Sequence, residues 1–135
     1  MVVFSLKLAD EYQQFGVRNN VIDMLVHNNE RVRTQAMKTL IRLADEKTPM
    51  ILLGYFRKEG LINQSMILDA LTVLATGKER DCLVRILNHE NNIIKLKAAI
   101  VLANCCSDGM DLLEKRALAE PEPFERILRH VKTVK

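Results

Sequence analysis

The feature that most constrains this chain is a helix–turn–helix segment, residues 19–45, that recurs along the sequence. In its second half, residues 30–44, apolar side chains return every three or four positions, which is the period of one face of an α-helix. The preceding apolar stretch, residues 20–27, is only about two turns long, and so short a helix is marginal on its own. The segment must therefore bury its apolar face against further copies of itself.

Such copies are present in the sequence. The strongest is residues 89–102, which match residues 27–40 at a shift of 62 positions. A second copy, residues 5–11, repeats residues 40–46 at a shift of 35 positions. A repeat of roughly 30 residues built from paired helices is the pattern of an α-solenoid.

The two best copies share a motif in which a turn residue is followed by a β-branched residue, a basic residue, an alanine and a leucine. The motif consists of Asn29, Val32, Arg33, Ala36 and Leu40 in one copy, and of Asn91, Ile94, Lys95, Ala98 and Leu102 in the other. It resembles the short bacterial HEAT-like repeats of the PBS-lyase type, and the resemblance covers most of the chain. It implies an all-α fold, a right-handed α-solenoid of about four antiparallel helix pairs that starts with a lone second helix. Such repeats serve many roles, so the resemblance specifies no partner.

We expect a single repeat domain over residues 1–135, because the chain has the length of one domain and is 48% hydrophobic. Its approximate units are a half repeat at residues 1–16 and four helix pairs at residues 19–45, 46–76, 77–106 and 107–135. Aromatic residues make up only 4% of the chain, which suits helix packing through small side chains and argues against strands. The long helix at residues 91–106 is apolar at nearly every position after Lys97, so we expect it to be the most buried.

Charge, cysteine content and hydropathy narrow the choice of function. The net charge of +3 is mild and does not by itself indicate nucleic acid. The cysteines, Cys82, Cys105 and Cys106, are odd in number and two are adjacent, which is no disulfide framework and favours a reducing compartment, the cytoplasm. No apolar run approaches the roughly 20 residues that span a bilayer, so we expect no membrane insertion by this segment.

The expected long helices together carry more excess basic charge than the chain as a whole, and in proteins with HEAT-like repeats the longer helices generally line the concave face. On that resemblance, a mildly basic stripe is formed by Arg31, Gln35, Lys38, Arg42, Lys97, Arg126 and Arg129. The stripe favours an acidic peptide or the acidic surface of a protein. The competing interpretation is an ordinary solvated face that keeps the chain soluble. In the motif, Arg33 and Lys95 hold a basic position that commonly ties neighbouring repeats together through a carboxylate, so we do not expect them to contact a partner.

Three further features each suggest a catalytic or metal site, but the sequence lacks the other residues that such a site would need. The pair His89-Glu90 resembles the His-Glu pairs of HEAT-like di-iron hydroxylases, but a two-metal site needs several such pairs and this chain has one. Cys105-Cys106 suggests a soft-metal or redox site, but free cysteine is among the most buried residue types, and no activating base is evident for a nucleophile. HEAT-like DNA glycosylases combine a basic groove with aromatic residues that contact the nucleotide, and the long helices here have few aromatic residues.

The leading hypothesis is therefore a non-enzymatic scaffold, without cofactor or catalytic residues, that binds a protein or an acidic peptide on the concave face. The alternative is a soluble docking or regulatory domain of a larger protein, for example one anchored in a membrane. It follows from the apolar start of the half repeat, where a terminal repeat should present a polar face. An enzyme of the glycosylase or metal-dependent hydroxylase type is the third and weakest hypothesis, and we do not expect nucleic acid as a partner.

Overall fold

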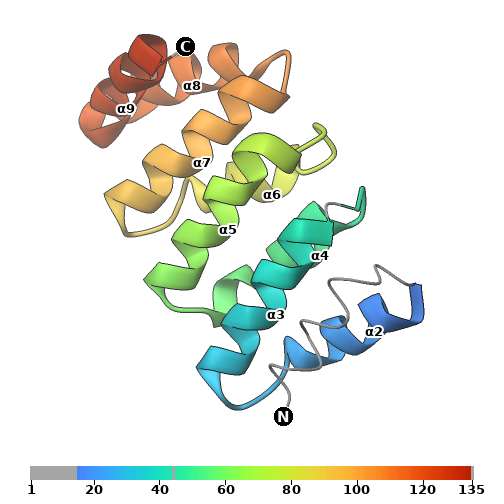
Figure 1. Cartoon of the computed structure of the whole chain (residues 1–135). Coiled ribbons are helices and arrows are strands. Elements are labelled where there is room, and N and C mark those ends of the chain that lie inside the picture. The colour runs from blue at the N-terminus through green and yellow to red at the C-terminus, as the bar shows by residue number, and fades with distance from the viewer. Residues whose placement is uncertain (1–14, 44, 135) are drawn as a thin grey trace. The chain divides into compact units, whose positions relative to one another are not determined.

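The computed structural model describes residues 15–43 and 45–134, and within these ranges the chain is helical and contains no strand (Figure 1). The all-α prediction is therefore confirmed. The chain divides into two compact units, an N-terminal unit that ends at Lys58 and a C-terminal unit that begins at Glu59. Most of the half repeat expected at residues 1–16 lies outside the described residues. None of the helices in the described ranges has the length and apolar character that crossing a bilayer requires.

The N-terminal unit consists of α2 (Phe15–Met24), α3 (Glu30–Leu43), α4 (Thr48–Tyr55) and the 3₁₀ helix η1 (Phe56–Lys58). Helix α3 packs against α2 and α4, and its predicted apolar face is buried through Ala36, Met37 and Leu40. The first helix differs from the prediction of residues 20–27, since α2 begins and ends earlier. Its end is early because Leu25 and His27 donate their N–H groups three residues back, to Ile22 and Met24, which tightens the last turn.

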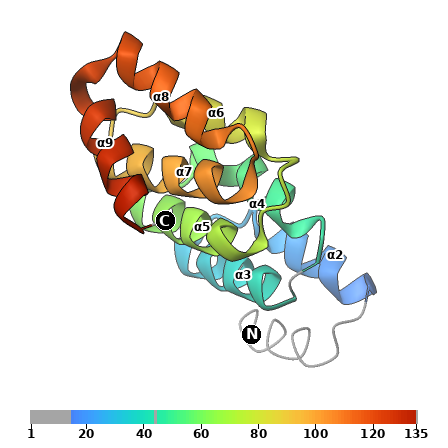
Figure 2. The same ribbon diagram turned by 90° about the horizontal axis from the view of Figure 1, so that it is seen from above.

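The C-terminal unit consists of α5 (Leu61–Leu74), α6 (Arg80–Ile86), α7 (Asn92–Cys105), α8 (Gly109–Ala119) and α9 (Pro121–Val134). Helices α5, α7 and α9 lie side by side, with α6 and α8 behind them (Figures 1 and 2). Helix α7 packs against all four of the others. As predicted from its composition, α7 is the most buried helix, with the buried residues Ile94, Ala98, Ala99, Val101, Leu102 and Ala103.

Three polar side-chain contacts between elements of the C-terminal unit share a sequence separation of 28 residues. The contacts are Asp69–Lys97, Arg80–Asp108 and Asn88–Arg116. The first two are ion pairs with a nitrogen–oxygen distance of 2.8 Å, and the third is a hydrogen bond from the guanidinium to the amide oxygen. The contacts Gln64–His89 and Glu114–Lys132 join elements of the same unit at other separations, 25 and 18 residues.

The same polar turn leads into α3 and into α7. Before α3, the Asn29 N–H donates to Nδ1 of His27 (3.0 Å), and the Asn29 side chain accepts the N–H of Arg31 (2.8 Å). Before α7, the Asn91 N–H donates to Nδ1 of His89 (2.9 Å), and the Asn91 side chain accepts two amides of the first turn. In each case the asparagine satisfies helix N–H groups that have no partner within the helix. The sequence copy at a shift of 62 positions thus reproduces one local structure in both units.

The start of α8 lies against the end of α7 so closely that only glycine fits. A Cβ atom on Gly109 would lie 2.2 Å from the carbonyl oxygen of Leu102 and 2.7 Å from its carbonyl carbon. Both atoms belong to the α7 backbone, which cannot move aside as a flexible side chain could. By contrast, a Cβ atom on Gly54, which is exposed on α4, would meet nothing within 4 Å.

We predict opposite effects for two Gly→Ala substitutions. Gly109→Ala should lower the free energy of unfolding by about 2 kcal/mol, because the methyl group forces α8 away from α7. Gly54→Ala should raise it by about 0.5 kcal/mol, because alanine loses less backbone entropy than glycine on forming a helix. Urea unfolding followed by circular dichroism measures both. Equal effects from the two substitutions would show that the close approach of α8 to α7 is wrong.

The Arg80–Asp108 contact leads to a second prediction, which concerns the pKa of Asp108. The hydrogen bonds from Arg80 lower the pKa of Asp108, and those to Asp108 raise the pKa of Arg80. Since the folded carboxyl has a lower pKa than the unfolded one, near 4, its stabilising contribution is complete above about pH 4 and is lost as the pH falls through the folded value. An NMR titration of the side-chain carboxyl carbon should show this lowered pKa. Arg80→Gln should return it toward about 4, while Arg85→Gln, a matched change on the same helix, should leave it lowered.

Candidate functional site

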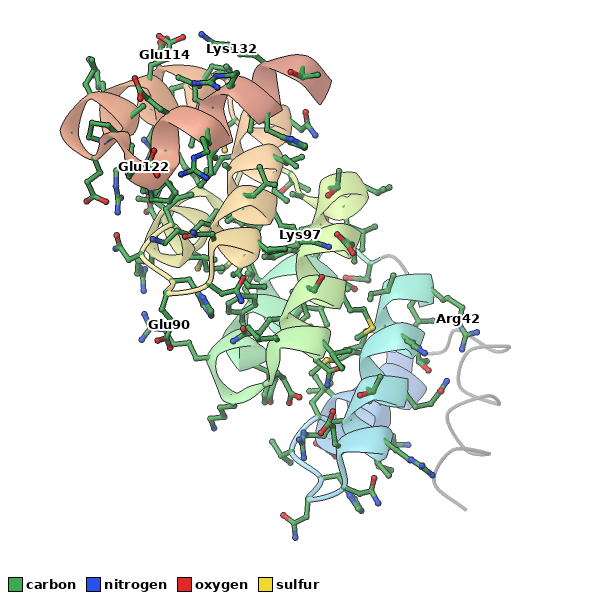
Figure 3. All side chains as sticks on the ribbon, turned by 90° about the vertical axis from the view of Figure 1, so that its left-hand side faces the viewer. Arg42, Glu90, Lys97, Glu114, Glu122 and Lys132 are labelled. Carbon is green, nitrogen blue, oxygen red and sulfur yellow. The ribbon has the colours of Figure 1, made fainter. Side chains whose placement is uncertain are left out.

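The predicted basic stripe divides between the two units, and the structure groups its N-terminal members on one face of α3. At about 100° per residue, the positions of Arg31, Gln35, Lys38 and Arg42 fall within about 60° of one another around the helix axis. Gln35 is half-buried and the other three are exposed. The buried apolar face of α3 holds this stripe toward solvent, and in Figure 3 Arg42 points away from the helix.

A shallow, open depression of about 760 Å³ lies along the first half of this face. Its lining includes Asn29, Glu30, Arg31, Thr34, Gln35 and Lys38. All of these residues have polar side chains, and they offer amide, hydroxyl and cationic groups together with one carboxylate. The depression is more open than the enclosed, largely apolar pockets that hold small molecules. It therefore suits contact with a peptide or a protein surface.

The two cationic side chains of this depression are not ion-paired within the described part of the chain. Arg31 and Lys38 are both exposed, and being seven residues apart they are separated by about 10 Å along the helix axis. The carboxylate of Glu30 reduces the local positive charge but leaves an excess. The face can therefore attract an acidic group at two points with hydrogen-bonding side chains between them.

The C-terminal members of the predicted stripe are mostly occupied by other contacts. The Lys97 ammonium binds both carboxylate oxygens of Asp69, at 2.8 and 3.0 Å, and Figure 3 shows this side chain reaching from α7 toward α5. Arg126 binds Glu122, four residues before it in the chain, at 2.8 Å. Arg129 is exposed and has no ion pair among residues 15–43 and 45–134. The exposed basic character predicted for this part of the stripe is therefore reduced by neighbouring carboxylates.

The basic residues of the repeat motif make structural contacts. Nη1 of Arg33 donates to the carbonyl oxygens of His27 and Asn28, at 2.9 and 3.0 Å, and so fixes the turn before its own helix. Nζ of Lys95 lies 5.7 Å from the centre of the Phe124 ring on α9, within the range of a cation–π contact. Arg33 therefore contacts backbone carbonyl groups, and Lys95 contacts an aromatic ring.

The His89-Glu90 pair has a geometry fixed by hydrogen bonds. Because the N–H of Asn91 can only donate, Nδ1 of His89 is the acceptor, and the proton of the neutral ring lies on Nε2. Nε2 then donates to the side-chain oxygen of Gln64 at 3.1 Å. Both ring nitrogens are thus engaged, while Glu90 is exposed and points away from α7 (Figure 3). The described residues contain no group of three or more histidine, cysteine or carboxylate side chains placed to hold a metal ion.

Sequence reasoning missed three members of the depression, Asn29, Glu30 and Thr34. The signal was available, because Thr34 lies three residues after Arg31 and four before Lys38, and both intervals keep side chains on one helix face. Asn29 and Glu30 come from the first turn of α3 and its preceding residue, where the chain direction changes. They line the depression because of the geometry of this turn, which cannot be predicted from the helical period.

Comparison of this chain with protein-family models, with curated proteins and with solved structures found no match. Its function is therefore inferred from its own residues and their geometry.

Proposed function

We propose that this chain is a non-enzymatic scaffold that binds an acidic peptide, or an acidic segment of a protein, along the exposed face of α3. The observation that carries the proposal is the pair of exposed cations, Arg31 and Lys38, aligned on one polar depression and not ion-paired among the described residues. Other basic side chains of the predicted stripe, such as Lys97, are already bound to carboxylates.

We also propose that the helices form an α-solenoid of HEAT-like repeats. The separation of 28 residues that three polar contacts share supports this arrangement, as does the recurrence of the His-x-Asn turn before α3 and α7. A further support is that α7 packs both on the helix of its own pair, α6, and on the long helices before and after it in the chain. In solenoids each repeat contacts its neighbours in this way, and the side presenting the long helices forms the binding surface.

Recognition would depend mainly on charge and hydrogen bonding. Two carboxylates two or four residues apart in an extended peptide lie on the same side of it, about 7 or 13 Å from each other, a span that the long side chains of Arg31 and Lys38 can match. The side chain of Gln35, which lines the depression between them, is placed to hydrogen bond with the intervening backbone. Exposed ion pairs contribute only about 0.2–1 kcal/mol each, so we expect weak binding that salt weakens further.

We also propose that the protein is cytoplasmic. Cys82, Cys105 and Cys106 are all free thiols, and free thiols persist in reducing compartments. The same acidic-segment binding would serve a domain of a larger protein, since the α3 face does not depend on what else the chain is attached to.

The proposal predicts that reversing two charges on α3 abolishes a preference for acidic ligands. Against an array of short random peptides, the unmodified chain should select sequences rich in Asp and Glu. The Arg31→Glu/Lys38→Glu variant should bind those peptides at least about tenfold more weakly, because two attractions become repulsions. Glutamate is favourable in the first turn of a helix, where Arg31 lies, and forms helix about as well as lysine at position 38, so the helix should remain intact, which circular dichroism checks.

The matched control is Arg57→Glu/Lys58→Glu, which makes the same change in charge on η1 of the same unit. It should bind the selected peptides nearly as well as the unmodified chain. If both variants lose binding equally, only net charge matters and the α3 face is not the site. If no acidic preference is found, or if duplex DNA binds with an affinity that falls steeply with salt, the proposed ligand class is wrong.

A further inference from the structure

Two sulfur atoms lie 3.3 Å apart where α7 ends, on the adjacent residues Cys105 and Cys106. Cys105 is the last residue of α7, and Cys106 follows it with an extended backbone. The Cys106 N–H donates to the carbonyl of Leu102, and its carbonyl accepts the N–H of Gly109, each at 3.1 Å. The pair is thus held between α7 and α8, and both residues are half-buried, which leaves them accessible to a small molecule.

An ordinary disulfide does not suit this pair. Consecutive Cα atoms across a trans peptide are about 3.8 Å apart, whereas disulfides join Cα atoms about 4.4–6.8 Å apart. Bringing the two sulfurs to the bonding distance of about 2.05 Å would therefore strain the backbone. A single atom that binds both sulfurs requires no such movement.

The separation of the sulfurs indicates which kind of atom fits between them. With bonds of about 2.3 Å, the length of zinc–thiolate bonds, sulfurs 3.3 Å apart subtend an angle of about 90° at the bound atom. A tetrahedral centre with the same bonds needs sulfurs roughly 3.8 Å apart and two more ligands. The described residues offer no third histidine, cysteine or carboxylate ligand. A pyramidal centre with nearly right-angled bonds that needs only two ligands from the protein fits better.

We propose that Cys105 and Cys106 form a bidentate site for trivalent arsenic that carries one organic substituent. Trivalent arsenic is thiophilic and pyramidal, and its organic substituent occupies the third position. In the reaction with an arsine oxide, two arsenic–sulfur bonds form and the arsenic–oxygen bond breaks. The two thiol protons leave with the oxygen as water. Arsenic remains trivalent and neither sulfur is oxidised, so no other reactant is needed.

The protonation state of the Cys105 thiol makes the pair a poor site for simple alkylating agents. Burial, together with the hydrogen bond to Cys106, raises the pKa of the Cys105 thiol to about 12. Cys105 is therefore protonated at neutral pH and reacts slowly with reagents that form one bond, since the thiolate is the nucleophile. A bridging ligand forms its second bond within the same molecule, which strengthens binding at equilibrium without requiring a reactive thiolate.

The test uses the full chain, phenylarsine oxide and an excess of a reducing monothiol, followed by gel filtration and intact mass measurement. We expect one phenylarsenic group per chain, retained in the monothiol and removed by a small dithiol. Cys105→Ser and Cys106→Ser should each raise the concentration needed for half-saturation at least about 100-fold, because the adduct becomes monodentate. Cys82→Ser, a matched change at the third cysteine on α6, should bind as the unmodified chain does.

The proposal is overturned if either Cys105→Ser or Cys106→Ser retains the adduct in excess monothiol, or if Cys82→Ser loses it. It is also overturned if the unmodified chain gains no monothiol-resistant adduct. Alanine in place of serine at each position, with circular dichroism of every variant, separates loss of the site from loss of folding. A folded Cys105→Ala variant that still holds the adduct would show that the arsenic is bound elsewhere.

Discussion

Burial of the apolar side chains of α7 is the interaction on which the C-terminal unit depends. Six residues of this helix are buried, and the helix contacts α5, α6, α8 and α9. Three of the six are alanines, which allow neighbouring backbones to come close, and Gly109 extends this close packing to the start of α8. The larger side chains Ile94 and Leu102 are almost fully buried, and each such burial contributes about 1.5–3 kcal/mol. Without α7, the remaining four helices would lose their common partner.

Polar contacts on the surface of the C-terminal unit contribute little to its stability, but they help to fix how its helices are aligned with one another. Asp69–Lys97 and Arg80–Asp108 are partly exposed, and exposed ion pairs stabilise weakly. Their equal sequence separation nevertheless favours one alignment of successive elements over its alternatives. A basic residue that fixes register is then less available to a partner, which explains why Lys97 contributes less to a binding face than its sequence position suggests. On α3, Lys38 has no such role within the described residues, and its charge remains available.

These differences show which properties could be predicted from the sequence. The helical period of α3 and the apolar composition of α7 are properties of single helices, and both predictions are confirmed. The pairing of Lys97 with Asp69 depends on how α7 is aligned with α5. That alignment cannot be predicted from the periodicity of either helix alone. The alignment of Arg31, Gln35 and Lys38 is again local to one helix, so the residues predicted there do share a face. The depression itself also needs Asn29, whose position follows from the turn.

The buried acids of the C-terminal unit explain why the exposed face of α3 is the better candidate site. Glu79 is 1% exposed, yet its carboxylate accepts the N–H groups of Thr76 and Gly77 and the Thr76 hydroxyl. Glu59 is also buried and accepts a hydrogen bond from the Asn63 amide. A carboxylate held in this way is fixed as a structural acceptor, whereas a general acid or base must exchange protons with a substrate. By contrast, Arg31 and Lys38 on the exposed face of α3 are not ion-paired among the described residues, so their charges stay available to another molecule.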